Sequence, residues 1–287
     1  MLYRGAHGTN RRVRVVSATV RERVALLALA FSPYGIDPYG IDKRALAEYF
    51  SRSEWLYHNY FDVLVVGAEH VPASGRAMLV GNHSGGVALD GAIVIASGFF
   101  ELEPPRLIHA MLDRFLASLP GVSRLLCRVG QFTGLPEHAV RLLEDDRLLL
   151  VFPEGARGTA KLASQAHTLV RFGTGFMRLA MATRSPVVPF AFLGGGEAIP
   201  TVRNLYGLGK LLGVPYVPVT RYVLPLPRPA RLTLIYGEPM RFEGTGREPD
   251  DEVLEHVERV RARIARLLEQ GAALRAGRLR ESEIAFG

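Results

Sequence analysis

The sequence is poor in the residues that form disulfides and zinc sites. Its 287 residues include one cysteine, Cys127, so an internal disulfide is excluded and a reducing compartment fits. Cys127 has apolar neighbours and no obvious base beside it, which favours a buried structural thiol over a nucleophile. Cysteine and histidine also form no cluster with the spacing of a zinc site. We therefore expect no metal and no resident cofactor.

Long apolar runs are missing as well. The run near the N-terminus, residues 24–31, has eight residues, whereas a helix that crosses a bilayer needs about 20. Pro33 follows this run almost at once, in place of the small residues of a leader-peptide cleavage site. The sequence therefore predicts neither a membrane-spanning helix nor a cleaved leader.

Lysine is scarce, so the net charge of +7 comes almost wholly from arginine. Residues 1–24 contain six arginines against one acid, Glu22. Such a segment is attracted to an anionic membrane, at about 1 kcal/mol for each basic group near the surface; a solvated basic helix or tail is the alternative. No aromatic residues interleave with these arginines, so nucleic acid is not an expected partner. We expect a cytoplasmic protein at the inner face of a membrane. The six arginines are Arg4, Arg11, Arg12, Arg14, Arg21 and Arg23.

The length suits one α/β domain with a well-buried core. Short apolar runs that end at glycine, proline or polar residues predict strands, and amphipathic stretches between them predict helices. The expected fold is therefore a single α/β domain with a central, mostly parallel or mixed sheet flanked by helices. The predicted strands are 62–67, 77–81, 148–152, 187–193 and 232–236, and the two clearest amphipathic helices are 164–184 and 251–268.

A first polar cluster, Asn82-His83-Ser84-Gly85-Gly86, follows the predicted strand 77–81. A histidine there can take a proton from a hydroxyl or amine near neutral pH, and Asp90 is the nearest carboxylate that would hold its tautomer. One continuous helix over these residues would separate His83 and Asp90 by roughly 10 Å along its axis. We therefore expect a non-helical loop, followed by a helix from about residue 88 to 99. Glycine amides in such a loop can face a developing oxyanion.

A second polar cluster has the same arrangement. Phe152-Pro153-Glu154-Gly155-Ala156-Arg157-Gly158 follows the predicted strand 148–152, so both clusters lie in loops after strands, where α/β folds place chemistry. Glu154 and Arg157 make this loop a candidate anion site. The alternative is that they pair with each other at a surface turn, a contact worth little.

Taken in this order, the two clusters resemble the motifs of glycerolipid acyltransferases, the lysophospholipid or 1-acylglycerol-3-phosphate acyltransferases. The resemblance covers about residues 60–240, including Pro186–Phe190 and Gly237–Pro239. It implies that His83 deprotonates an acceptor hydroxyl, which then attacks the thioester of acyl-CoA or acyl-carrier protein, and that Asp90 orients His83. The substrate-binding residues that it implies are Ser84, Gly85, Gly86, Glu154, Gly155 and Arg157.

Two features depart from the family pattern. Six residues separate His83 from Asp90, where the family usually has four. The family also has an arginine that contacts the acceptor phosphate, but the corresponding stretch here, residues 130–136, contains none. Arginine binds two phosphate oxygens at once, so its loss favours a less charged acceptor. A subgroup related to the diacylglycerol acyltransferases is therefore the better relative.

Two other functions stay open. A lipid-binding protein with the same fold but altered catalysis would account for the wider spacing between His83 and Asp90. A serine esterase would use residues 83–86 only as an oxyanion hole, but the chain has no Gly-x-Ser-x-Gly segment for its nucleophile.

We divide the chain into a basic helical segment at 1–50, an acyltransferase domain at 51–270 and a loosely held tail at 271–287. Within the domain, residues 206–219 are apolar and carry only Lys210 as charge. This stretch is expected to cover an acyl-chain tunnel, to enter the lipid interface, or to be buried by ordinary packing.

Overall fold

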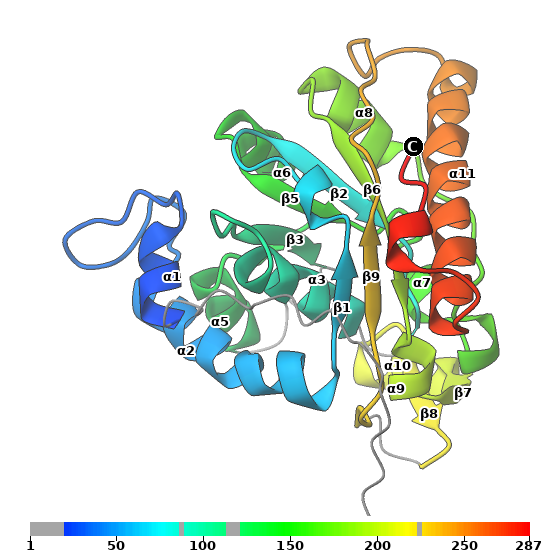
Figure 1. Ribbon diagram of the computed structural model, residues 1–287. Coiled ribbons are helices and arrows are strands. Elements are labelled where there is room, and N and C mark those ends of the chain that lie inside the picture. The colour runs from blue at the N-terminus through cyan, green and yellow to red at the C-terminus, as the bar shows by residue number, and fades with distance from the viewer. Residues whose placement is uncertain (1–19, 86–88, 113–120, 223–225) are drawn as a thin grey trace, which may run out of the picture.

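A seven-stranded sheet with helices on both faces forms the body of the protein (Figure 1). The structure is a computed structural model that describes residues 20–85, 89–112, 121–222 and 226–287. The strand order is β1-β9-β6-β2-β5-β3-β4; β6 and β9 pair antiparallel, and the other neighbours pair in parallel. The predicted α/β class with a mostly parallel sheet is confirmed. The strands are β1 (Leu64–Val66), β2 (Ala77–Gly81), β3 (Ile108–Leu112), β4 (Phe132–Thr133), β5 (Leu148–Val151), β6 (Val187–Leu193) and β9 (Thr233–Tyr236).

The helices of the described residues are mostly short. The α-helices are α1 (Val20–Leu26), α2 (Lys43–Trp55), α3 (Leu89–Phe100), α5 (Val122–Arg128), α6 (Pro136–Glu144), α7 (Ala156–Thr159), α8 (Gly175–Ala182), α9 (Gly195–Ala198), α10 (Tyr206–Leu212) and α11 (Asp250–Arg275). A π-helical turn η1 (Leu56–Tyr60) continues α2, and η2 (Ala68–His70), η3 (Ala163–Gln165) and η4 (Glu281–Glu283) are 3₁₀ turns.

All five predicted strands are present, whereas β3 and β4 were not predicted. Strand β3 contains a polar residue, His109, which is completely buried and donates from Nδ1 to the carbonyl oxygen of Gly130 at 2.7 Å. Burial lowers the pKa of His109 to about 4, so the ring is neutral and tolerable in the core. Strand β4 has only two residues, too few to show a periodic pattern.

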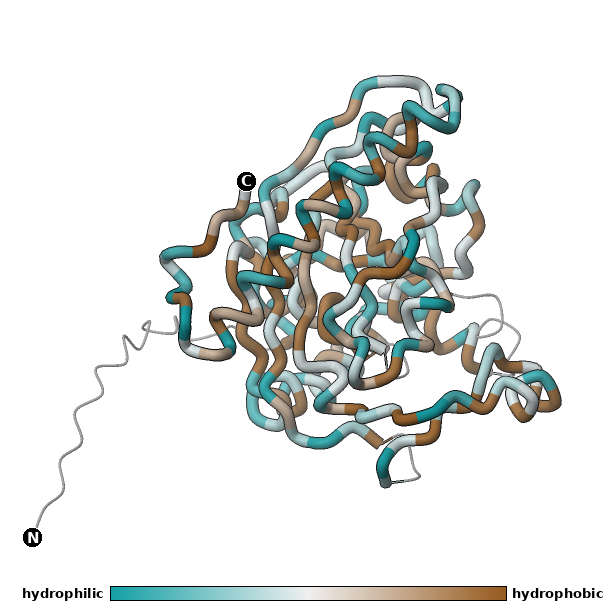
Figure 2. The backbone as a smooth tube through the Cα atoms, turned by 90° about the vertical axis from the view of Figure 1, so that its right-hand side faces the viewer, coloured by the Kyte–Doolittle hydropathy of each residue, from teal (hydrophilic) through white to brown (hydrophobic). Residues whose placement is uncertain are grey.

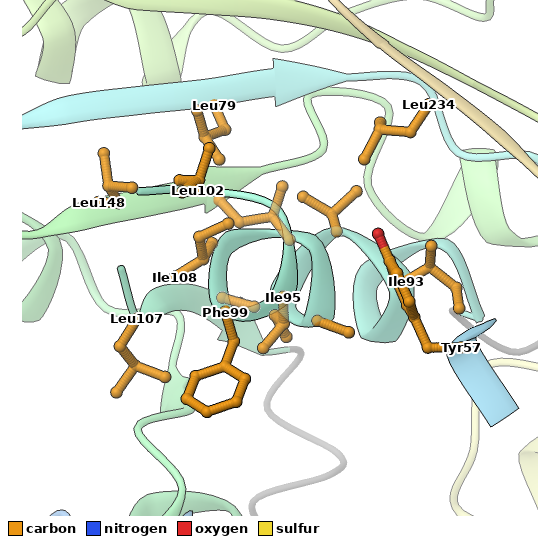
Figure 3. Packing of buried hydrophobic residues seen from close by; sticks show 14 of the residues in the cluster. Tyr57, Leu79, Ile93, Ile95, Phe99, Leu102, Leu107, Ile108, Leu148 and Leu234 are labelled. Atoms are coloured by element: carbon orange, nitrogen blue, oxygen red, sulfur yellow. The ribbon is translucent and has the colours of Figure 1, made fainter. Parts of the chain in front are cut away.

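The sheet is buried on both sides because its residues alternate between two cores. In β2, Ala77 and Leu79 belong to one core, and Met78 and Val80 to the other. Figure 3 shows Leu79 on the sheet side of α3 and Phe99 on its opposite side. Phe99 stacks on Phe50 of α2 with ring centroids 3.8 Å apart. Helix α3 therefore lies between the sheet and α2, which explains why it is apolar almost all round.

Helix α11, predicted as an amphipathic helix over 251–268, covers the other face of the sheet and extends to Arg275. Its polar and apolar residues alternate along the tube in Figure 2, where this helix faces the viewer. Gly271 allows close packing, since a Cβ there would come 2.6 Å from Leu193 Cδ1. The buried positions are Val253, Val257, Val260, Ile264, Leu267, Leu268 and Gly271.

Two other expectations about this half of the chain were wrong. Only residues 175–182 of the predicted helix 164–184 are α-helical, because Gly173 interrupts the segment and its amide donates to the carbonyl oxygen of Pro153 at 2.9 Å. The C-terminal tail, 271–287, is not loosely held. Arg263 donates to the carbonyl oxygen of Phe286 at 2.7 Å, and Ile284 is buried in the same hydrophobic cluster as the apolar side of α11.

Residues 20–50 share a core with the sheet, although the sequence pattern set them apart as a basic segment. Val24, Leu46 and Phe50 belong to the same buried cluster as Leu79 of β2. Arg23, expected among the membrane-facing arginines, is only 5% exposed. The first four arginines of that set lie outside the described residues, so the prediction of membrane contact there stays a prediction. In the described part of the chain, no helix is both long and apolar enough to cross a membrane.

Arg23 stabilises the end of α3. Its guanidinium donates to the carbonyl oxygens of Phe99 and Leu102, both at 2.9 Å, and to Glu103 at 2.6 Å. These carbonyls lie at and beyond the helix C-terminus, where backbone acceptors lack partners within the helix and the macrodipole favours a cation.

Between α9 and β9 the chain leaves the sheet. Strands β7 (Thr201–Leu205) and β8 (Val217–Thr220) form a separate antiparallel pair joined by α10, and the three elements lie together at the lower end of the molecule (Figure 1). We call residues 201–220 the excursion. Leu208, Leu211 and Leu212 are exposed, so the expectation of ordinary buried packing for this stretch was wrong for α10.

We predict that Arg23→Ala lowers the free energy of unfolding by about 2–4 kcal/mol, because two buried carbonyls lose a charged donor. Urea denaturation followed by far-UV circular dichroism measures the change. Arg21→Ala, an exposed neighbour on the same helix, is the control and should change stability by less than about 0.5 kcal/mol. Equal effects of the two substitutions would contradict this role.

Candidate active site

The loop that carries His83 is anchored to the sheet by Asn82. The Asn82 side chain donates to the carbonyl oxygen of Phe192 at 3.0 Å and accepts from the Phe192 amide at 2.8 Å. It thereby continues the pairing of β2 with β6 for one more residue. Because β2, β5 and β6 are parallel neighbours, the polar residues that follow β2 and β5 meet at one edge of the sheet.

His83 and Asp90 are in contact, as the residues predicted. Nδ1 of His83 lies 3.0 Å from Oδ2 of Asp90, which also accepts from the Ser84 amide at 2.9 Å. The Gly91 amide lies 2.8 Å from the other carboxylate oxygen. Asp90 stands in the first turn of α3, which begins at Leu89, one residue after the predicted start. The wider spacing therefore does not separate the pair.

Asp90 is ionised and sets the tautomer of His83. Burial by itself raises the pKa of Asp90, but the facing His83 and the amides of Ser84 and Gly91 together lower it below its usual value. An ionised carboxylate only accepts hydrogen bonds, so Nδ1 of His83 carries the proton and Nε2 has the free lone pair. This is the orientation that a general base requires.

The His83 ring is also held from the side of the second cluster. Phe152, directly after β5, stacks on it with ring centroids 3.8 Å apart and an interplanar angle of 15°. Gly158 packs against the histidine as well, since a Cβ there would come 2.8 Å from the Cβ of His83. His83 is 7% exposed. Little space is therefore left for the ring to rotate.

Glu154 pairs with Lys161, a residue that the sequence reasoning missed. Nζ of Lys161 lies 2.5 Å from Oε2 of Glu154 and donates to the carbonyl oxygen of His83 at 2.7 Å. Both side chains are buried, which raises the pKa of Glu154 and lowers that of Lys161, and their mutual attraction opposes both shifts. Lys161 is one of only three lysines and the only one near either motif, a signal that was available in the sequence.

The alternative pairing of Glu154 with Arg157 at a surface turn is not observed. Arg157 is exposed on α7 and has no hydrogen bond or ion pair with any described residue. Gly155, also exposed, has a φ of 57° at the start of α7, a backbone conformation that favours glycine.

The remaining predicted residues belong to the first loop. Gly85 has a φ of 82°, and a Cβ there would come 2.5 Å from the Lys161 carbonyl oxygen. Ser84 is buried against Gly195, and its Oγ lies 3.4 Å from Asp90 Oδ2. Gly86 lies outside the described residues. Within the described ranges, no group of His, Cys, Asp and Glu side chains is arranged to hold a metal ion.

We predict that Lys161→Met lowers the free energy of unfolding by about 3–5 kcal/mol, because it leaves the Glu154 carboxylate buried without a partner. Glu154→Leu should be similarly costly, and the double variant should lose much less than the sum of the two. Urea denaturation of the four proteins measures this coupling. Lys210→Met, at an exposed lysine, is the control, and additive losses would show that the pair is not coupled.

Comparison with known proteins finds similar sequences and one similar fold. A family model described as Acyltransferase matches residues 62–193. An uncharacterized protein of Mycobacterium leprae is 30% identical over 239 residues, which make up 79% of this chain and 63% of that protein. The chain thus spans a little under two thirds of the length of that relative. A Bos taurus protein named DGAT1/2-independent enzyme synthesizing storage lipids is 28% identical over 136 residues, 47% of this chain and 38% of its own.

A solved structure shares the fold. The 1-acyl-sn-glycerophosphate (LPA) acyltransferase PlsC from Thermotoga maritima aligns with a TM-score of 0.54 at 20% identity, over 79% of this chain and 80% of that one. The family model covers both polar clusters, from β1 through the end of β6. Residues 62–193 of this chain therefore match the acyltransferase family model, and the whole domain shares the fold of that solved structure.

Proposed function

We propose that this protein transfers a fatty acyl group from a thioester, acyl-CoA or acyl-carrier protein, to a hydroxyl or amine of a glycerolipid or lysophospholipid-like acceptor. The observation that carries the proposal is the 3.0 Å contact between His83 and an ionised Asp90, inside the segment that matches the family model. It leaves Nε2 of a buried histidine free as a base.

The proposed reaction is a direct transfer. Nε2 of His83 takes the proton of the acceptor hydroxyl while the oxygen attacks the thioester carbonyl carbon, and Asp90 stabilises the imidazolium that forms. The tetrahedral intermediate then collapses, the carbon–sulfur bond breaks, and the thiolate leaves with the proton from His83. The Gly85 amide has no acceptor among the described residues, so we assign it, with Gly86, to the developing oxyanion.

The acceptor in this proposal carries little charge. Glu154 is paired with Lys161, and Lys161 donates to the backbone of His83, so neither side chain is available to a substrate. Within that block, a substrate phosphate would meet a single basic side chain, the exposed Arg157. In residues 130–136, the stretch without the family arginine, the Gln131 side chain is already hydrogen-bonded within the protein. It accepts from the Ala110 amide at 2.7 Å and donates to the carbonyl oxygen of Ile108. The name of the bovine relative, an enzyme that synthesizes storage lipids, favours a neutral glycerolipid such as diacylglycerol.

The test uses purified protein with long-chain acyl-CoA or acyl-carrier protein, and with diacylglycerol or a lysophospholipid as acceptor. Mass spectrometry reads the acylated product. We expect His83→Ala to lower turnover by about 10²–10⁴-fold and Asp90→Asn by at least about 10²-fold, because the amide no longer enforces the productive tautomer. His138→Ala, at an exposed histidine on α6, should leave turnover unchanged.

Other outcomes identify the alternatives. Turnover that survives His83→Ala would remove this residue as the base. Labelling by a fluorophosphonate would indicate a serine esterase, although Ser84 is buried beside Asp90. Lipid binding without turnover on either donor would favour the catalytically altered lipid-binding protein.

A further inference from the structure

Helix α10 turns its apolar side chains to the solvent. Leu211 is 81% exposed and Leu212 61%, whereas Gly209 is the buried residue of this helix. Gly209 faces β8, since a Cβ there would come 2.6 Å from the Cα of Tyr216. A helix on the surface of a soluble domain normally packs its apolar side inward. In α10 the glycine side is the packed side and the leucine side is free.

The apolar surface continues beyond the helix. Of the thirteen large apolar side chains that are exposed in the described part of the chain, seven lie between residues 202 and 226, and the others are spread over residues 26–125. A concentration of this kind marks a binding surface. We call five of the seven the α10 face: Val202, Tyr206, Leu208, Leu211 and Leu212.

The part of the chain that forms and follows this face carries charge of one sign. Between Glu197 and Glu238 the sequence has no acidic residue but five basic ones, all of which are exposed. Two copies of such a face would repel each other, whereas an anionic lipid surface attracts basic groups and accepts apolar side chains. Charge therefore favours a membrane over a second copy of the chain. The five are Arg203, Lys210, Arg221, Arg228 and Arg231.

The excursion is joined to the candidate active site through α7. Asn204 donates to the carbonyl oxygen of Ala160 at 2.6 Å, and Tyr216 is hydrogen-bonded to the Thr159 side chain. Burial raises the pKa of Tyr216, and the charge of Asp90 adds to this rise, which shows that the two residues lie within electrostatic reach. Gly158 of the same short helix touches His83.

We infer that the α10 face docks on the surface of an anionic bilayer, with its leucines at the headgroup boundary and its basic residues against the headgroups. The residues of this face are separate in the sequence from residues 1–24. Docking here brings the membrane close to the α7 segment, which contacts both the excursion and His83, so a lipid acceptor reaches His83 from the bilayer. That last step rests on the proposed function, whereas the docking itself needs no turnover.

The experiment is sedimentation of the full chain with vesicles of phosphatidylcholine and phosphatidylglycerol, and with vesicles of phosphatidylcholine alone. We expect the wild type to bind the mixed vesicles more tightly, and Leu211→Asp/Leu212→Asp to weaken that binding by about tenfold or more. Arg203→Glu/Lys210→Glu should weaken binding to the mixed vesicles only. Leu125→Asp, at an exposed leucine on α5, is the matched control and should bind as the wild type does.

Three results would overturn the inference. In the first, the wild type binds neither kind of vesicle. In the second, the leucine variant binds as tightly as the wild type, which would leave residues 1–24 as the membrane contact. In the third, size-exclusion chromatography without lipid shows a wild-type dimer that the leucine variant dissociates, which assigns the face to a second copy. Thermal melting checks that the variant is folded. His83→Ala should bind vesicles normally, so failure of docking and failure of the proposed catalysis are separable.

Discussion

The buried ion pair of Glu154 and Lys161 holds together the two loops that form the candidate active site. Removing two charges from water costs several kcal/mol for each ion, and only close pairing and further hydrogen bonds offset this cost. Here Lys161 lies 2.5 Å from the carboxylate and also donates to the backbone of His83. The position of the histidine therefore depends on a lysine 78 residues further along the chain.

Four ionisable side chains interact in this small buried region. With His83 neutral, Asp90 and Glu154 ionised and Lys161 protonated, the group carries one net negative charge. A positive charge on His83 acts to lower the pKa of Asp90 and that of Glu154, and the charge of Asp90 acts to raise the pKa of Lys161. The imidazolium that the proposed reaction forms at His83 would face the ionised Asp90 at 3.0 Å. The Glu154–Lys161 pair has no net charge, so its contribution here is to position the His83 loop.

Much of this arrangement could be predicted from short-range patterns. Apolar runs that stop at polar residues located β2, β5 and β6, and the glycine-containing loop located His83 before a helix that begins within one residue of the expected place. Patterns failed where distant partners decide the conformation. The Gly173 amide donates to the Pro153 carbonyl oxygen and interrupts the expected helix, and β3 includes His109 because the Gly130 carbonyl oxygen accepts a hydrogen bond from its ring. Neither partner can be identified from local periodicity.

The sequence by itself determined the α/β class, the two polar clusters and the His83–Asp90 pair, because each follows from residues close together in the chain. Only the tertiary structure decided that Glu154 pairs with Lys161 and not with Arg157, that Arg23 is buried at the end of α3, and that the α10 leucines face outward. The physical reason is the same for all three. Whether a charge is paired or an apolar side chain is covered depends on which distant segments pack against it, and amino-acid patterns of a few residues contain no record of those neighbours.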